Sequence, residues 1–115
     1  MRIAITSQNF RTITGHAGKT RRFVVYEVEG DGEPLEVDRL DLPREMSLHE
    51  YHGDDHPLYR LGLDALVTQG AGEGFQSRMA RHGIQVYATS ASDPLEVVRA
   101  LARGLPLPPA APHEH

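Results

Sequence analysis

His16 stands in a short basic stretch near the start of the chain that is rich in glycine. The glycines and cations around it are Gly15, Gly18, Lys19, Arg21 and Arg22. An imidazole can ligate a metal ion, and clustered cations together with loop amides can bind an anion. The stretch therefore predicts either a small anion or metal site, or a basic turn that only starts the strand that follows.

The end of this stretch matches part of a nucleotide-binding P-loop. Gly18, Lys19 and Thr20 fit the last positions of the pattern G-x-x-x-x-G-K-[ST], but the first glycine of the pattern would fall on Ile13. A P-loop also runs into a helix, whereas Thr20 leads into a run of strand-forming residues. We therefore do not expect nucleotide hydrolysis.

A second glycine-rich stretch holds Gly70, Gly72 and Gly74. Phe75 stands where the dinucleotide fingerprint needs its third glycine, so a Rossmann cofactor is not expected. A strand that ends in glycines before a helix exposes backbone N–H groups and the positive end of the helix dipole. This stretch therefore predicts an anion seat, or alternatively a tight turn without a ligand.

Three further histidines lie close together in a polar segment. His49, His52 and His56 are spaced by three and four residues, which would align them on one face of a helix. Gly53 and Pro57 argue against a continuous helix there. We expect a long polar loop with three candidate metal ligands, because imidazole commonly binds zinc, iron, nickel or copper.

Composition limits the chemistry that is open to the chain. With 115 residues it suits one domain, and it contains no cysteine, so disulfides, thiolate nucleophiles and cysteine-held clusters are excluded. No apolar run approaches the length of a membrane span, and the start lacks the apolar core of a signal peptide. We expect a cytoplasmic protein with no membrane partner.

Charge is distributed unevenly along the chain. The net charge is −4, which argues against general nucleic-acid binding. Residues 1–26 contain no acidic side chain, whereas residues 27–55 contain eleven acids and only two bases, Arg39 and Arg44. This pattern predicts either a solvated surface of uneven composition or a local anion site at the first loop.

Periodicity places these residues on elements. We expect strands at residues 2–6, 23–28, 35–40, 65–68 and 84–89, a short helical segment at 57–61, and helices over 75–82 and 94–103. The last helix has Asp93 as N-cap and Gly104 as its stop, with a buried stripe of Leu95, Val98, Leu101 and Ala102.

Three leading strands followed by alternating helix and strand predict a mixed sheet with helices packed on it. The expected fold class is α/β, a three-layer domain over residues 1–105. Residues 106–115 are rich in proline and alanine, and we expect an extended, poorly ordered tail there.

The order of these motifs resembles the dinitrogenase iron-molybdenum cofactor biosynthesis family. The matching features are MRIAITS at the start, TGHAG at 14–18 leading into FVVY, HPL at 56–58, LDALVTQGAGEGF at 63–75, RMARHGIQVYAT at 78–89 and DPLEVVRALARG at 93–104. The resemblance implies a fold similar to ribonuclease H, with a five-stranded mixed sheet flanked by helices. Ala17 departs from the family, because many relatives have phenylalanine after the corresponding histidine.

The resemblance also implies a function. The chain resembles carriers that hold the iron-molybdenum cofactor or its iron-sulfur precursor, and in these carriers a histidine is a proposed contact. The implied contact here is His16, with Gly70, Gly72 and Gly74 on the opposite rim. Gly15, Gly18, Lys19, Arg21 and Arg22 would complete the site, and the cofactor is expected to be absent from the purified protein. The implied partners are nitrogenase cofactor assembly proteins, with the chain a monomer or weak homo-oligomer.

Two enzymatic alternatives are not expected. A nuclease of the ribonuclease H type needs clustered carboxylates, usually with one on the first strand, and residues 1–7 contain none. No serine lies in a G-x-S-x-G elbow. The remaining alternative to a cluster carrier is a small regulatory or interaction domain that binds a simple metal ion through His49, His52 and His56, or binds a protein partner.

Overall fold

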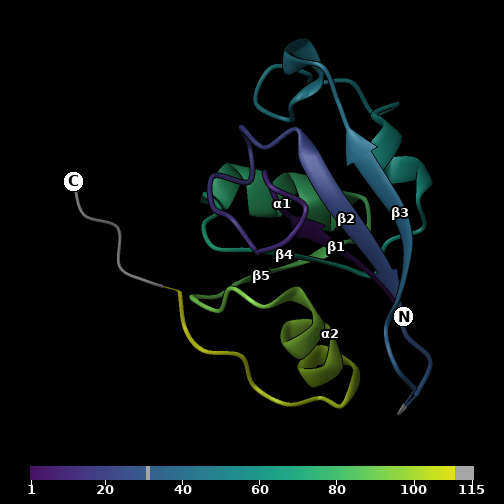
Figure 1. Ribbon diagram of the computed structural model, residues 1–115. Helices are drawn as coiled ribbons and strands as arrows, with labels where there is room; N and C mark the ends of the chain where they lie inside the picture. The colour runs from purple at the N-terminus through teal and green to yellow at the C-terminus, as the bar shows by residue number, and fades with distance from the viewer. Residues whose placement is uncertain (31, 111–115) are drawn as a thin grey trace.

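The computed structural model describes residues 1–30 and 32–110 (Figure 1). Its secondary structure comprises five strands, two α-helices and two short 3-10 helices. The strands are β1 (Arg2–Thr6), β2 (Arg22–Glu27), β3 (Leu35–Asp41), β4 (Ala65–Thr68) and β5 (Gln85–Ala88). The helices are η1 (Arg44–Met46), η2 (Pro57–Arg60), α1 (Glu73–Arg81) and α2 (Pro94–Ala102).

The five strands form one mixed sheet in the order β3-β2-β1-β4-β5. The pairs β1–β2 and β2–β3 are antiparallel, whereas β1–β4 and β4–β5 are parallel. The antiparallel half comes from chain reversals along the sequence, and the parallel half needs a crossover, which α1 supplies between β4 and β5. The predicted mixed α/β sheet is confirmed.

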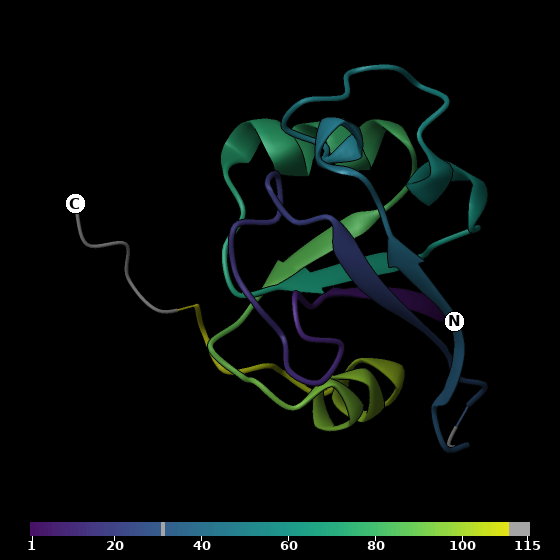
Figure 2. The same ribbon diagram turned by 45° about the horizontal axis from the view of Figure 1, so that its top comes forward.

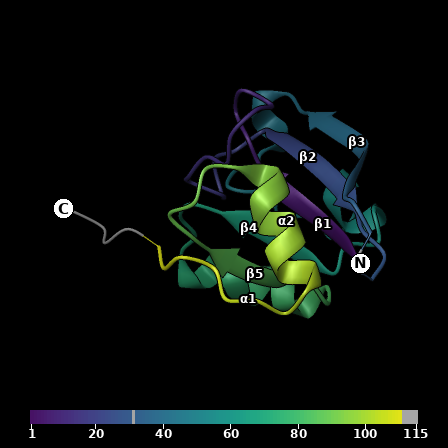
Figure 3. The same cartoon turned by 60° about the horizontal axis from the view of Figure 1, so that its bottom comes forward.

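Alternate residues of β1 face opposite sides of the sheet, and each side is covered by one helix. Ile3 and Ile5 belong to the same buried cluster as Val98 of α2, whereas Ala4 belongs to the cluster of Met79 in α1. Figures 2 and 3 show α1 and α2 on opposite faces. The molecule therefore has three layers, while its relation to ribonuclease H stays a prediction.

Helix α2 begins as expected and buries the predicted stripe except at Leu95, because Val98 is in the buried cluster and Leu101 and Ala102 pack against it. The Asp93 carboxylate accepts a hydrogen bond from the Leu95 N–H at 3.0 Å, and Pro94 is the first helical residue. Val98 is fully buried as predicted, but Leu95 is 38% exposed and Val97 is 1% exposed. The prediction for Leu95 is wrong because Pro94 and Val97 take the buried positions of the first turn, which leaves Leu95 on the outer side.

Part of the predicted tail lies against the domain. The hydroxyl of Thr89 donates a hydrogen bond to the carbonyl of Pro108 at 2.6 Å, and the Ser90 N–H donates to the carbonyl of Pro109 at 3.1 Å. Leu107 packs against the cluster on the α2 side. Residues 111–115 of the predicted tail lie outside the described residues. Within residues 1–30 and 32–110, neither α-helix has the length and apolarity that a bilayer crossing requires.

The α2 packing leads to a prediction with an internal control. Replacing Val98 by alanine should lower the free energy of unfolding by about 2 kcal/mol, because two buried methyl groups are lost and a cavity remains. Leu95→Ala should change it by less than about 0.5 kcal/mol, because that side chain is exposed. Urea denaturation measures both values, and equal losses would contradict the exposed position of Leu95.

Candidate functional site

The loop that carries His16 is fixed to the ends of two neighbouring strands. The carbonyl of Thr14 accepts hydrogen bonds from the hydroxyl of Thr6 at 2.7 Å, the hydroxyl of Thr68 at 3.2 Å and the N–H of Gln69 at 3.0 Å. Thr6 ends β1 and Thr68 ends β4, and these strands are parallel, so their carboxyl ends meet at one edge of the sheet. The loop is therefore held at that edge.

A second contact joins this loop to the glycine-rich loop. The N–H of Ala17 donates a hydrogen bond to the carbonyl of Gly70 at 3.0 Å, and Ala17 is buried. His16 has a φ of 57°, in the left-handed region that residues with a Cβ rarely adopt. Its carbonyl accepts from the N–H groups of Lys19 and Thr20, which closes a tight turn, and the residue is exposed. Such strained residues are found disproportionately at functional sites.

The two loops enclose a pocket of about 210 Å³, which we call the histidine pocket. It is lined by His16, Ala17, Gly18, Lys19, His49, Gly70, Ala71 and Gly72. The structure thus brings together His16, Lys19 and two of the three rim glycines that the sequence suggested. Among the described residues, no acidic side chain lines this pocket, so it suits an anionic guest.

His49 reaches the histidine pocket from a third segment. Its N–H donates a hydrogen bond to the carbonyl of Gly18 at 2.5 Å, which holds the segment after η1 against the His16 loop. The sequence reading placed His49 in a separate metal site with His52 and His56. Spacing along the chain gave no signal for this placement, because it depends on how a long connection folds back.

Gly70 and Gly72 line the histidine pocket opposite His16, as predicted, but Gly74 does not line it. Gly72 is the N-cap of α1 and offers no side-chain cap, so the N–H groups of the first turn remain open to a ligand. Gly74 lies inside that first turn and lines another pocket together with His52. The helix begins two residues earlier than predicted, which moves Gly74 off the rim.

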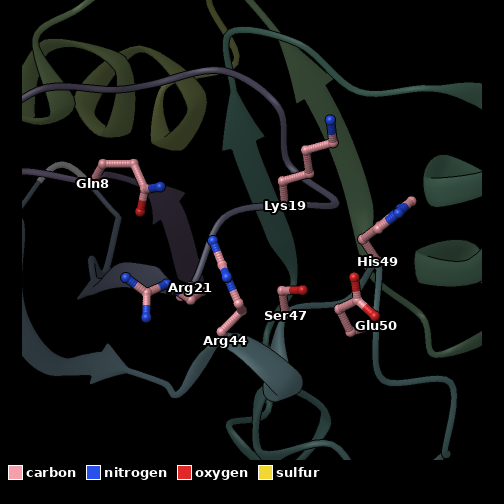
Figure 4. A pocket seen from close by; sticks show the side chains of 7 residues that line it. All are labelled: Gln8, Lys19, Arg21, Arg44, Ser47, His49 and Glu50. Carbon is pink, nitrogen blue, oxygen red and sulfur yellow. The ribbon is translucent and has the colours of Figure 1, made fainter.

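The predicted cations divide into two groups. Arg22 forms an ion pair with Asp41 at 3.2 Å, donates to the carbonyl of Gln8 at 2.9 Å and lies over the ring of Phe10, so it is engaged in the fold. Arg21 lines a neighbouring pocket of about 780 Å³ that Lys19 and His49 also line (Figure 4). Gly15 lies with His16 and Lys19 along a third pocket of about 360 Å³.

The three histidines of the polar segment are not arranged as a metal site. His56 is fully buried, its Nε2 lies 2.7 Å from the carbonyl of Met46, and its Nδ1 accepts from the N–H of Leu58 at 3.1 Å. Both ring nitrogens are occupied, so no lone pair remains for a metal. Within the part of the chain that the structure describes, no three histidine or acidic side chains are grouped to hold an ion.

Comparison with known proteins agrees with this architecture. The sequence model of the family described as "Dinitrogenase iron-molybdenum cofactor" matches residues 1–104. The chain belongs to this family. Membership ties it to the iron-molybdenum cofactor and its biosynthesis, as the resemblance implied. No curated protein matches the chain significantly.

Two solved structures share the fold of this family member. The crystal structure of PH0822 is 23% identical, with a TM-score of 0.69 over 91% of this chain and 93% of that one. The NMR structure of TM1290 from Thermotoga, provisionally named a NifB protein and assigned to the DUF35 family, is 15% identical. Its TM-score is 0.61 over 99% of this chain and 97% of that one. At these identities the likeness concerns the fold alone.

The buried His56 should make stability depend on pH. Burial, and then the nearby charge of Arg78, lower the pKa of His56 from its ordinary 6.5. The unfolded chain therefore takes up this proton at a higher pH than the folded one, so the stabilisation is complete above about pH 6.5 and is lost as the pH falls below it. Thermal unfolding between pH 7.5 and 5 measures this dependence.

The matched variant is His56→Gln, which keeps an amide donor but does not titrate. It should be less stable at pH 7.5 by about 1–3 kcal/mol, because one buried hydrogen bond is lost. Its stability should also fall less steeply with acid than that of the parent. Parallel pH profiles for the two proteins would show that His56 is not the titrating group.

The left-handed backbone at His16 gives a stability prediction of its own. His16→Gly should leave the free energy of unfolding unchanged or raise it by up to about 1 kcal/mol, since glycine removes the strain but adds unfolded-state entropy. His16→Ala keeps the strain and should be about 1 kcal/mol less stable than His16→Gly. Chemical denaturation of both variants decides, and an alanine variant as stable as the glycine variant would argue against the strain.

Proposed function

We propose that this chain is a non-catalytic carrier that binds the iron-molybdenum cofactor or its iron-sulfur precursor in the histidine pocket. The observation that carries the proposal is the meeting of His16 and His49 with Lys19 and the Gly70–Gly72 loop around one hollow. The family tie to the cofactor supports the same cargo.

Each part of the pocket has a chemical role toward such a cargo. The imidazoles of His16 and His49 offer ligand nitrogens to a metal position of the cluster that is not saturated by sulfide. Lys19 and the backbone N–H groups at the start of α1 offset the negative charge of sulfide and carboxylate groups. These groups come from three different loops, so binding would tie the loops together.

Exposure of the ligating side chains suits transient binding. His16, Lys19 and His49 are all exposed, so a cargo held there stays accessible to a second protein. The histidine pocket shares lining residues with three larger neighbours, which gives a guest larger than 210 Å³ room to extend. We infer that delivery to nitrogenase cofactor assembly proteins in the cytoplasm is the task.

A simple metal ion on the polar segment is the competing function. His56 has no free ring nitrogen, which leaves His49 and His52. These two line a pocket of about 360 Å³ together with Arg78 and Arg81, and two guanidinium groups oppose the binding of a divalent cation. The charges therefore favour an anionic cluster over a bare ion.

Anaerobic titration of the protein with extracted cofactor tests the proposal. The parent should shift in native-gel mobility and change in visible absorption, and His16→Ala and His49→Ala should each weaken binding by about tenfold or more, since a ligand is lost. His52→Ala is the matched control, because His52 is an exposed histidine of the same segment outside the histidine pocket.

An unchanged profile for the parent, or full affinity in both His16→Ala and His49→Ala, would overturn the carrier assignment. Metal analysis of protein purified without a nickel column covers the competing function. Stoichiometric zinc or nickel that disappears in a His49→Ala/His52→Ala double variant would favour the simple ion instead.

A further inference from the structure

The connection between η1 and η2 brings His49 to the histidine pocket without a helix or strand of its own. Residues 47–56 contain only turns and irregular backbone. The carbonyl of Ser47 accepts hydrogen bonds from the N–H of Glu50 at 3.1 Å and from the N–H of Tyr51 at 2.8 Å, so residues 47–51 form a tight turn. A segment without regular backbone pairing opens easily, so its position depends on contacts with the rest of the fold.

One arginine of α1 contacts this turn both before and after His49. Nη1 of Arg78 donates a hydrogen bond to the carbonyl of Leu48, and Nη2 donates one to the carbonyl of Tyr51. Among residues 1–30 and 32–110, neither carbonyl accepts from any other group. Both bonds are charge-assisted, and Arg78 is half-buried, so they hold the turn more strongly than bonds between neutral groups would.

The far end of the connection is held by different contacts. The ring of Tyr59 stacks on that of His82, with 3.6 Å between the ring centroids, and a carboxylate oxygen of Asp54 lies 3.4 Å from Nε2 of His82. These contacts are five or more residues beyond His49. They fix the approach to η2 and leave the turn at 47–51 to its own anchors.

The other side-chain anchor of the turn is less directional than Arg78. Leu48 is 2% exposed and belongs to the buried cluster on the α1 side, which fixes where the turn lies. Burial of an apolar side chain has no preferred direction, whereas a hydrogen bond weakens steeply when it is misaligned. The two bonds from Arg78 therefore set the orientation of the peptide groups that flank His49.

We propose that Arg78 is a positioning residue of the carrier site, which fixes the peptide groups around His49 and so keeps its imidazole at the histidine pocket. This proposal rests on the carrier function proposed above. Groups that bind a ligand have to be held within about 0.5 Å of the productive geometry. His16 lies on another loop, which Arg78 does not bond to, so Arg78 acts on the site through His49.

Arg81 provides a matched control. It lies three residues further along α1 and lines the same pocket of about 360 Å³ as Arg78. Within the part of the chain that the structure describes, no hydrogen bond or ion pair engages its guanidinium. Arg81→Gln therefore removes the same charge from the same pocket without releasing a carbonyl, which separates a general effect of charge on an anionic cargo from positioning.

Amide hydrogen exchange, followed by NMR, tests the positioning without any cargo. The N–H of His49 donates to the carbonyl of Gly18, so its exchange rate reports whether the turn stays against the His16 loop. In Arg78→Gln this amide should exchange about tenfold faster or more, because two charge-assisted bonds are lost. The amide of Ala17, which donates to Gly70, should keep its rate, and Arg81→Gln should change neither amide.

Anaerobic titration with extracted cofactor measures the consequence for binding. Arg78→Gln should weaken binding by about tenfold in the parent background, because a ligand is no longer held in place. In the His49→Ala background it should weaken binding no more than Arg81→Gln does there, since its effect requires His49. A residue with a merely structural role would weaken binding equally in both backgrounds.

Equal weakening in the two backgrounds, an unchanged His49 amide, or faster exchange at His49 and Ala17 alike would overturn the role of Arg78 and leave the carrier function intact. Failure of the parent to bind the cofactor would overturn the carrier function itself. The two failures are distinguishable, because the exchange measurement decides whether Arg78 holds His49 in the absence of any cargo.

Discussion

The carbonyl oxygen of Thr14 is the atom on which the candidate site depends. Three donors from the ends of β1 and β4 converge on it, and two of these are hydroxyls of fully buried threonines. Displacing this carbonyl is costly, because each lost bond would leave a buried threonine hydroxyl or a backbone N–H without its partner. The loop that follows is therefore fixed where it begins, and the strained turn at His16 is held by the rest of the structure.

Some cations of the chain form ion pairs that belong to the fold, and others line the pockets. The acidic segment 27–55 supplies partners to arginines elsewhere: Glu27 to Arg2, Asp41 to Arg22 and Glu33 to Arg99. These exposed pairs contribute little to stability individually. These acids are neutralised away from the pockets, and Lys19, Arg21 and Arg44 form no ion pair among residues 1–30 and 32–110.

Local signals in the sequence were enough for the elements. The runs at β1 and β4 have the predicted bounds, and Asp93 and Pro94 mark the start of α2. The site was harder to predict for two reasons. Arg22 forms an ion pair with Asp41, and a backbone hydrogen bond to Gly18 places His49 beside the His16 loop. Both depend on contacts between segments far apart in sequence. Arg44 had one available signal, as one of only two bases in the acidic segment.

The strand order has a consequence for how this architecture can change. Strands β1 and β4 are adjacent, but the segments that follow them diverge. The chain runs from β1 to β2 on one side of the pair, and from β4 through α1 to β5 on the other. A crevice must open where the chains part, whatever side chains lie there. The connectivity of the strands alone therefore creates space for a ligand. Related proteins can therefore change the residues that line this crevice, and with them the bound ligand, without any change in the sheet.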